Sequence, residues 1–225
     1  MVKVSIIIPN WNTLDYLKKC VESIKKYTKD YELIILDNGS KEKGTKQYIN
    51  SVADKWIFSP KNMGFSKGNN MAASIAGGEF FCFLNSDTEV GENWLKDLLI
   101  LFEKKNCGAV GPLANPTPTN IYYPQHKGQY SEDTRVPVLV GVCLLIKKGL
   151  FEKIGGWEES FKNGYEDNYL SELIKKEGKD LWISVNSKVY HKEPSQTFKA
   201  NNLNYLKTLE YNKNIFEEKM ELLNG

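Results

Sequence analysis

Residues 3–9 read KVSIIIP and residues 31–37 read YELIILD, and these two apolar runs decide the fold. Both are rich in β-branched residues and have the length of a strand, and runs this apolar must be covered on both faces. Between them, apolar residues recur at the spacing of one helix face: Leu14, Leu17, Val21 and Ile24. The stretch therefore predicts a strand, a helix and a second strand.

The alternation continues along the chain. Further strands are predicted at residues 56–58, 79–84, 108–110, 138–146 and 180–185. Further helices are predicted before residue 56 and at residues 66–76, 94–103, 166–176 and 201–223. Strands that alternate with helices predict an α/β fold with a central, mostly parallel sheet flanked by helices. Ligands of such sheets bind at the carboxyl ends of the strands.

Residues 113–136 interrupt this pattern with Pro, Asn, Thr, Tyr and Gly. A loop of this length inside a compact domain is commonly a lid or a binding loop, and a tolerated surface insertion is the alternative. We expect this loop, with Tyr122, Tyr123 and Arg135, to be mobile in the free protein and to become ordered over a bound ligand.

Composition excludes several classes of protein. The chain of 225 residues is 41% hydrophobic and 26% charged, as in an ordinary globular protein of one or two domains. Its net charge of +2 gives little reason to expect a nucleic-acid partner. The longest apolar run is too short to span a membrane, and no signal-peptide pattern opens the chain, so we expect a cytoplasmic protein. Four cysteines are scattered singly, which fits neither a zinc site nor a disulfide framework: Cys20, Cys82, Cys107 and Cys143.

Three polar clusters directly follow predicted strands: residues 10–12 (NWN), 37–40 (DNGS) and 85–87 (NSD). Mg²⁺ is typically held by one or two carboxylates together with substrate phosphates. Asp87 is therefore a candidate anchor for a metal diphosphate, and Asp37 is a candidate partner for a nucleoside base or ribose. Turn and helix-capping roles are the alternatives.

Other segments are candidates only in combination. Residues 60–70 (PKNMGFSKGNN) precede a helix, which suits backbone amides and Lys67 facing an anion. With a single arginine, Arg135, the chain has few guanidinium groups for phosphate. Neither a GxGxxG after the first strand nor a GxxxxGK[ST] loop is found, which disfavours hydride transfer and P-loop hydrolysis.

Glu166 and Asp167 open a predicted helix, where acidic residues are often only partners of the helix dipole.

Seven motifs in chain order resemble the family 2 glycosyltransferases of the GT-A fold, and most closely the rhamnosyltransferase-like branch. The motifs are SIIIPNWN (5–12), DNGS (37–40), NMGF with GNN (62–65 and 68–70), FLNSDT (83–88), GGW with Phe161 (155–157), YED (165–167) and His191. The resemblance covers the chain from Val4 to about Phe216. It implies a single Rossmann-like GT-A domain over residues 1–225, with a nucleotide-sugar-binding half (1–110), an acceptor and catalytic half (111–200) and a C-terminal helix (201–225).

The resemblance also implies roles for individual residues. The metal ligands would be Asp87 and His191, and the catalytic pair would be Asp167 and Glu166. The nucleotide sugar would be bound by Pro9, Asn10, Asn12, Asp37, Asn62, Lys67, Asn70, Asn85, Ser86 and Trp157. Asp167 is expected to be the general base and Glu166 to turn toward a backbone amide or solvent, because neighbouring helix positions point about 100° apart. Trp157 is expected to present its ring face to the sugar, with a core tryptophan as the alternative.

The implied activity is transfer of a hexose or deoxyhexose from a UDP-, dTDP- or GDP-sugar to a hydroxyl of a glycan or lipid-linked glycan, as in polysaccharide biosynthesis. A single base and no carboxylate nucleophile predict inversion at the anomeric carbon. The expected cofactor is Mn²⁺ or Mg²⁺, although Asn85 stands where the family often has aspartate. No transmembrane segment is expected, and peripheral membrane association stays open. The alternatives are a nucleotidyltransferase and a non-catalytic sugar-binding or scaffold module.

Overall fold

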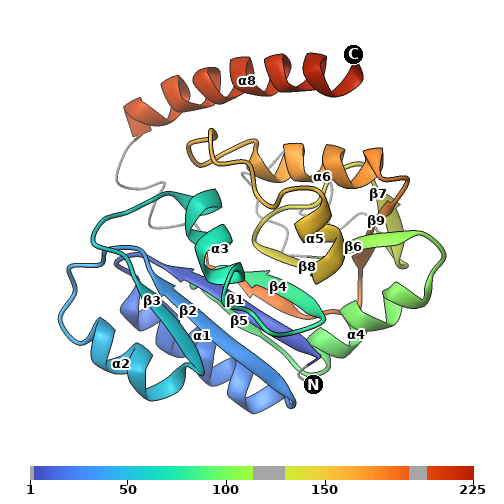
Figure 1. Cartoon of the computed structure of the whole chain (residues 1–225). Coiled ribbons are helices and arrows are strands. Elements are labelled where there is room, and N and C mark those ends of the chain that lie inside the picture. The colour runs from blue at the N-terminus through green and yellow to red at the C-terminus, as the bar shows by residue number, and fades with distance from the viewer. Residues whose placement is uncertain (1–2, 114–129, 193–201) are drawn as a thin grey trace.

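The structure is a computed structural model and describes residues 3–113, 130–192 and 202–225 (Figure 1). The strands are β1 (Val4–Asn10), β2 (Tyr31–Asp37), β3 (Lys55–Phe58), β4 (Phe80–Leu84), β5 (Thr88–Val90), β6 (Cys107–Pro112), β7 (Thr134–Val136), β8 (Cys143–Lys147), β9 (Asp180–Ser184) and β10 (Val189–His191). The helices are α1 (Leu14–Tyr27), α2 (Thr45–Val52), α3 (Phe65–Ala73), α4 (Trp94–Ile100) with the 3₁₀ turn η1 (Leu101–Glu103), α5 (Lys148–Lys153), α6 (Glu166–Lys176) and α8 (Asn202–Asn224).

Eight of these strands form one sheet in the order β3-β2-β1-β4-β8-β6-β9-β7. The first four strands in this order are mutually parallel, as the strand and helix alternation predicted. β8 and β7 run antiparallel to their neighbours, so the carboxyl-terminal half of the sheet is mixed. β10 pairs antiparallel with β5 in a separate two-stranded sheet. The predicted α/β class with a central sheet flanked by helices is confirmed.

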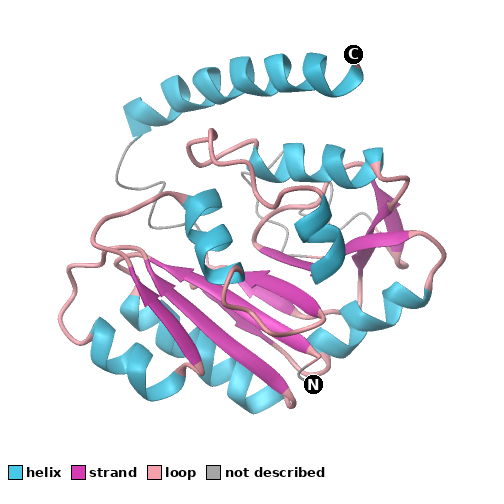
Figure 2. Ribbon diagram, in the orientation of Figure 1, coloured by secondary structure: helices cyan, strands magenta, loops and turns pink. Residues whose placement is uncertain are grey.

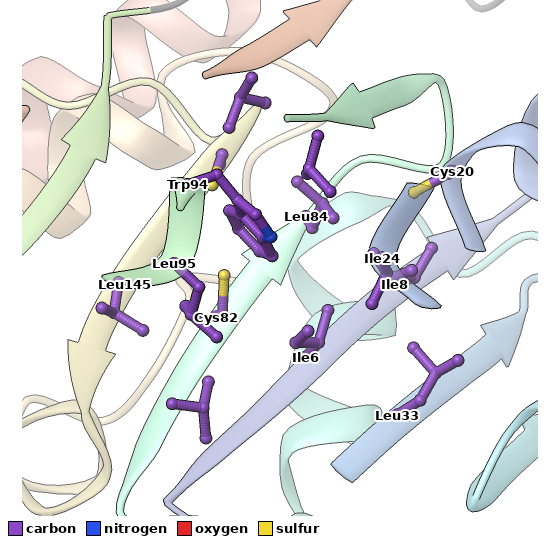
Figure 3. Packing of buried hydrophobic residues seen from close by; sticks show 14 of the residues in the cluster. Ile6, Ile8, Cys20, Ile24, Leu33, Cys82, Leu84, Trp94, Leu95 and Leu145 are labelled. Carbon is purple, nitrogen blue, oxygen red and sulfur yellow. The ribbon is translucent and has the colours of Figure 1, made fainter. Parts of the chain in front are cut away.

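Helices cover both faces of the sheet, as Figure 2 shows. On β1, Ile6 and Ile8 face the core that contains α1, whereas Ile7 faces the core that contains α3 and α6. Figure 3 shows Ile6 and Ile8 near Ile24 of α1 and Leu33 of β2. The two cores explain why KVSIIIP has no polar alternation, since a strand in the middle of three layers has no solvent-exposed face.

One predicted strand is shorter than expected. The run at residues 138–146 forms a strand only from Cys143, because the ladder with β4 ends where Leu84 faces Cys143. Before that point the chain is bound by α6 side chains instead, and the Leu139 N–H donates to Ser171 Oγ at 3.1 Å. Leu139 is fully buried, so its apolar character reflects a buried loop and not a strand.

The predicted loop at residues 113–136 lies mostly outside the described residues, including Tyr122 and Tyr123. Its described end contains β7, where Arg135 lies 3.5 Å from the Asp180 carboxylate across the sheet edge. Among the described helices, none combines the length and apolar character that crossing a membrane requires.

The amino-terminal ends of the strands are joined by a buried carboxylate. Glu32 Oε2 accepts hydrogen bonds from Ser5 Oγ at 2.6 Å and from the Gly77 N–H at 2.8 Å, and Lys55 Nζ lies 2.6 Å from Oε1. Burial opposes ionisation, but the hydrogen bonds from Lys55, Ser5 and Gly77 outweigh it and lower the pKa of Glu32. The carboxylate thereby connects β1, β2, β3 and the turn before β4.

We predict that Glu32→Ala lowers the free energy of unfolding by about 1–3 kcal/mol at pH 7, because the Ser5 hydroxyl and the Gly77 N–H lose their acceptor. Because the folded-state pKa of Glu32 is lowered, its contribution is present above the unfolded-state pKa of about 4.3 and disappears as the pH falls through the folded value. Urea unfolding across pH 3–7 measures this. Exposed Glu22→Ala is the control, and equal stability of the two variants at pH 7 would contradict the prediction.

Candidate active site

Polar side chains from three parallel strands meet at the carboxyl end of the sheet. Asn10 closes β1, Asp37 closes β2, and all of Asn10 and 99% of Asp37 is buried. Asn10 Nδ2 contacts Asp37 Oδ1 at 3.5 Å, and Asn10 Oδ1 accepts a hydrogen bond from Thr13 Oγ1 at 2.8 Å. Thr13 Oγ1 also lies 2.9 Å from Ser86 Oγ beyond β4. A continuous hydrogen-bonded chain therefore runs across the ends of β2, β1 and β4.

Asp37 keeps one oxygen available. Its Oδ1 accepts from Asn10 and from the Ser40 N–H, whereas Oδ2 is buried and has no hydrogen-bond partner among the described residues. A buried polar atom without a partner is costly, and such atoms often mark places where a ligand completes the bonding. Asp37 Oδ2 therefore suits a hydroxyl or N–H donor of a bound molecule.

Asn12 and Asn62 organise the loops around this edge. The Asn12 N–H donates to Ser40 Oγ at 2.8 Å, and Asn12 Oδ1 accepts from the Lys41 N–H at 2.8 Å. Asn62 Oδ1 accepts from Asn38 Nδ2 at 3.0 Å and caps the turn before α3. The structure thus places both predicted residues at the site, with these atoms engaged in loop contacts. Pro9 is half-buried on β1 beside them.

The turn after β2 can be made only by glycine. Gly39 has a φ of +80°, and a Cβ on it would lie 2.7 Å from the Lys61 backbone. The close approach brings the loop before α3 against the end of β2. This contact explains why the DNGS motif occurs directly after the strand.

Asp87 and His191 form a direct side-chain contact at the site. Asp87 directly precedes β5, and the antiparallel register places His191 opposite Thr88. His191 Nε2 lies 3.1 Å from Asp87 Oδ1, and the Lys192 N–H donates to the Asp87 carbonyl at 3.0 Å. Both side chains are almost nine-tenths buried. A histidine 104 residues away in sequence is therefore fixed against the carboxylate by a short strand pair.

These two side chains fit a divalent ion only as a partial ligand set. In the described residues, three or more His, Cys, Asp or Glu side chains nowhere converge as a metal cage. Such a pair leaves the remaining coordination positions to phosphate oxygens and water. The carboxylate suits Mg²⁺ or Mn²⁺, and Mg²⁺ is typically held by one or two carboxylates together with substrate phosphates, whereas an imidazole is a ligand more typical of transition metals. The residues present fit a metal that is bound together with a diphosphate.

Glu166 and Asp167 lie in the first turn of α6 and point to different partners. The Gly164 N–H donates to Glu166 Oε2, which turns this carboxylate back toward the backbone, as expected from the sequence. Asp167 Oδ1 accepts from the Asn168 N–H at 2.9 Å, and Oδ2 accepts from the Gly141 N–H at 3.4 Å. Asp167 thus faces the loop that enters β8.

Burial governs the ionisation of this pair. Desolvation raises the pKa of Glu166 to about 7, and the nearby negative charge of Asp167 adds to the rise. Desolvation also raises the pKa of Asp167 to about 6, and the hydrogen bonds from the Gly141 and Asn168 N–H groups oppose this effect. Carboxylates with pKa values near neutrality are suited to accept a proton at physiological pH.

One loop connects the two acidic clusters. The Gly141 N–H contacts Asp167, and the carbonyl of the next residue, Val142, accepts a hydrogen bond from the Asn85 N–H at 2.9 Å. A Cβ on Gly141 would lie 3.1 Å from the Phe65 ring at the start of α3. Asp87 and Asp167, from opposite halves of the chain, are therefore brought to the same edge of the sheet.

Trp157 is a core residue. Its side chain is 99% buried and makes edge-to-face contacts with Phe65 and Phe83 at centroid distances of 5.1 and 5.3 Å. The expectation that its ring face meets a sugar is therefore wrong for this structure, because both neighbours and the sheet cover the indole. The apolar environment of Phe83 on β4 favours burial over exposure.

Asn70 holds the Trp157 backbone rather than an open position for phosphate. Asn70 Nδ2 donates to the Trp157 carbonyl at 2.8 Å, and Asn70 Oδ1 accepts from the Trp157 N–H at 2.9 Å. Both ends of the amide are thus used within the protein, and the expected place of Asn70 beside a diphosphate stays a prediction. Lys67, one turn earlier, remains half-exposed with its Nζ 3.8 Å from Glu159.

Sequence reasoning gave no role in the site to Thr13 or Gly141, and it named Asn38 and Ser40 only as members of the DNGS cluster. Thr13 directly precedes α1, but its side chain makes no capping hydrogen bond and instead joins Asn10 to Ser86. The position of Gly141 inside an apolar run concealed the loop. A glycine interrupting such a run is the signal that could have identified it.

Residues 5–155 match Glycosyl transferase family 2, which is about two thirds of the chain. The chain belongs to this family. Over 85% of its length it is 26% identical to the O-antigen biosynthesis protein RfbC of Myxococcus xanthus, of which it covers 17%.

Two solved structures are similar in fold to this family 2 chain. The mannosyltransferase PcManGT from Pyrobaculum calidifontis, in complex with GDP-Man and Mn²⁺, has a TM-score of 0.73 and 18% identity over 88% of this chain and 59% of its own. GalNAc-T7 with UDP, GalNAc and Mn²⁺ has a TM-score of 0.72 and 21% identity over 85% of this chain and 44% of its own. The fold is the GT-A fold. The chain spans less than two thirds of the length of each of these three proteins.

We predict that Asn70→Ala lowers the free energy of unfolding by about 1–3 kcal/mol, because the buried Trp157 N–H and carbonyl lose their partners. Lys67→Ala on the same helix removes only a long, half-exposed ion pair and is expected to cost less than about 1 kcal/mol. Chemical denaturation of both variants compares the two effects. A larger loss for Lys67→Ala would show that Asn70 does not hold the loop.

Proposed function

We propose that this family 2 chain is an inverting, metal-dependent glycosyltransferase that moves a hexose or deoxyhexose from a nucleotide-diphosphate sugar to an acceptor hydroxyl. The observation that carries this proposal is the placement of the Asp87–His191 pair and the Asp167 carboxylate at one sheet edge, joined through Gly141 and Val142. Attack at an anomeric carbon needs a base on one side and a stabilised leaving group on the other.

The nucleotide belongs at the ends of β1 and β2. Asp37 Oδ2 supplies a buried acceptor for a base or ribose donor, with Asn10, Asn12 and Pro9 shaping its surroundings. Nearby residues that line the diphosphate position are Asn62, Lys67, Asn85 and Ser86. Residues 1–110 thus provide the donor half, residues 111–200 the acceptor half, and residues 201–225 the C-terminal helix. UDP-, dTDP- and GDP-sugars are the candidate donors.

Asp87 and His191 would hold Mn²⁺ or Mg²⁺ together with the diphosphate. When bound, the ion neutralises charge that develops on the departing diphosphate oxygen. The scarcity of arginine in the chain supports a role for a metal ion in binding the diphosphate, because lysines provide point charges and not bidentate forks.

Asp167 accepts the proton of the acceptor hydroxyl. The acceptor oxygen then forms its bond to the anomeric carbon while the bond from that carbon to the diphosphate oxygen breaks, and the electron pair leaves with the nucleotide diphosphate. Attack opposite to the leaving group inverts the anomeric centre. Glu166 is occupied by the Gly164 N–H and supports the turn. A glycan or lipid-linked glycan is the proposed acceptor, in keeping with the similarity to an O-antigen biosynthesis protein.

We predict that Asp87→Ala weakens the Mn²⁺-dependent affinity for nucleotide diphosphate by at least about 10-fold, because loss of an outer-shell partner alone commonly costs 10- to 100-fold. Calorimetric titration of UDP, dTDP and GDP with and without Mn²⁺ measures the effect. Glu89→Ala, on the adjacent strand β5, is the matched control. Unchanged metal-dependent affinity in Asp87→Ala would remove Asp87 from the metal site.

We predict that Asp167→Asn lowers turnover by about 10²- to 10⁴-fold while the nucleotide affinity stays within twofold, because the change keeps the shape and removes the base. Glu166→Gln is expected to cost less. The measurement is release of nucleotide diphosphate at saturating donor.

The pH dependence provides a second check on the same residue. Because burial raises the pKa of Asp167 to about 6, wild-type turnover is expected to rise with pH through that region and not near 4. The apparent value belongs to the coupled Glu166–Asp167 pair. Normal turnover in Asp167→Asn together with a large loss in Glu166→Gln would exchange the two roles.

A further inference from the structure

A buried asparagine of the C-terminal helix binds the backbone just before the catalytic turn. Asn212 lies on α8 and is completely buried. Its Oδ1 accepts a hydrogen bond from the Lys162 N–H at 2.9 Å, and its Nδ2 donates to the Lys162 carbonyl at 3.1 Å. The oxygen and the nitrogen of the Asn212 amide thus both bond to the backbone of Lys162, which fixes this backbone segment in position and orientation.

The segment held by Asn212 has an unusual backbone. Asn163, Gly164 and Tyr165 follow Lys162 directly, and all three have positive φ angles, of 52°, 139° and 70°. Consecutive residues in this region are strained unless their surroundings stabilise them. α6 begins at the next residue, Glu166, and Asp167 is the second residue of its first turn. The direction of the Asp167 carboxylate therefore depends on this turn.

Other contacts of α8 support the same turn. The ring of Phe216 lies 5.4 Å from that of Tyr165, and Lys219 Nζ is 2.8 Å from the Glu158 carboxylate. Figure 1 shows α8 crossing above α6 and its preceding loop, away from the sheet. At the other end of the loop, Asn70 holds the Trp157 backbone. The loop from Trp157 to Tyr165 is thus fixed at both ends by side-chain amides.

We propose that Asn212 is a positioning residue for catalysis: it fixes the turn at Lys162–Tyr165 so that Asp167 faces the Gly141 loop and the acceptor. This inference rests on the proposed role of Asp167 as the base. Within the described part of the chain, the side-chain hydrogen bonds of Asn212 go to Lys162 and not to the nucleotide residues on β1 and β2 or to the Asp87–His191 pair. Its loss should therefore change the chemical step and leave donor binding intact.

The test compares Asn212→Ala with Asn224→Ala, the same substitution at an exposed position of the same helix. The probes are UDP-glucose, dTDP-rhamnose and GDP-mannose with Mn²⁺, and the donor cleaved fastest is used for all variants. Misplacement of a catalytic group by about 1 Å can cost about 100-fold, so we expect kcat of Asn212→Ala to fall by about 10- to 100-fold. The donor KM is expected to stay within twofold, and Asn224→Ala to behave as wild type.

Asn212→Asp provides a second variant in case the alanine variant does not fold. Aspartate keeps an acceptor for the Lys162 N–H but cannot donate to the Lys162 carbonyl, so an intermediate loss of kcat is expected. Unchanged kcat in a folded Asn212 variant, or a parallel loss of kcat and donor affinity, would overturn the inference.

Asp167→Asn in the same assay separates this inference from the proposed function. If Asp167→Asn loses turnover and the Asn212 variants do not, the positioning role alone is wrong. If Asp167→Asn keeps normal turnover, the proposed base is wrong and the positioning role falls with it.

Discussion

The loop at Gly141 and Val142 makes the interaction on which the site depends. The Gly141 N–H donates to Asp167 on one side, and the Val142 carbonyl accepts from the Asn85 N–H on the other. This loop therefore joins the polar strand ends, where we propose that the nucleotide binds, to the Asp167 carboxylate, which we propose as the base. The antiparallel entry of β8 beside β4 creates this loop, since the strand ladder stops at Cys143 and leaves the preceding residues free to bind α6.

Side-chain amides perform much of the positioning in this protein. Asn10 and Asn38 organise the strand ends, while Asn70 and Asn212 hold the backbone of the loop before α6. An amide offers both a donor and an acceptor without charge, so it can bind a peptide group in the interior without the desolvation cost of an ion. The carboxylates of the site have other proposed roles: Asp87 in metal binding, Asp167 in proton transfer and Asp37 in binding the nucleoside.

The sequence was sufficient for the parallel half of the fold and for the edge where the polar residues gather. KVSIIIP and YELIILD are apolar because both faces of β1 and β2 are covered. Asn10 and Asp37 could be placed at the sheet edge because these two strands end at them. Residues 138–146 were misinterpreted because a buried loop and a buried strand have the same apolar composition. The structural roles of Trp157 and Asn70 could not be predicted from the sequence, since each depends on a contact between α3 and a loop almost ninety residues later. The rhamnosyltransferase-like branch and a cytoplasmic location stay predictions.

The central claim is that one edge of the sheet binds a metal nucleotide-diphosphate sugar and activates an acceptor against it. The most direct measurement incubates the protein with UDP-, dTDP- and GDP-sugars, in Mn²⁺ and in chelator, and identifies the nucleotide product together with the anomeric configuration of the released or transferred sugar. The account predicts release of nucleotide diphosphate from one donor class, dependence on the metal, and inversion of the anomeric centre. Conversion of the donor to a nucleoside triphosphate and a sugar 1-phosphate when pyrophosphate is added would indicate a nucleotidyltransferase, binding without turnover would indicate a non-catalytic module, and either result would contradict the account.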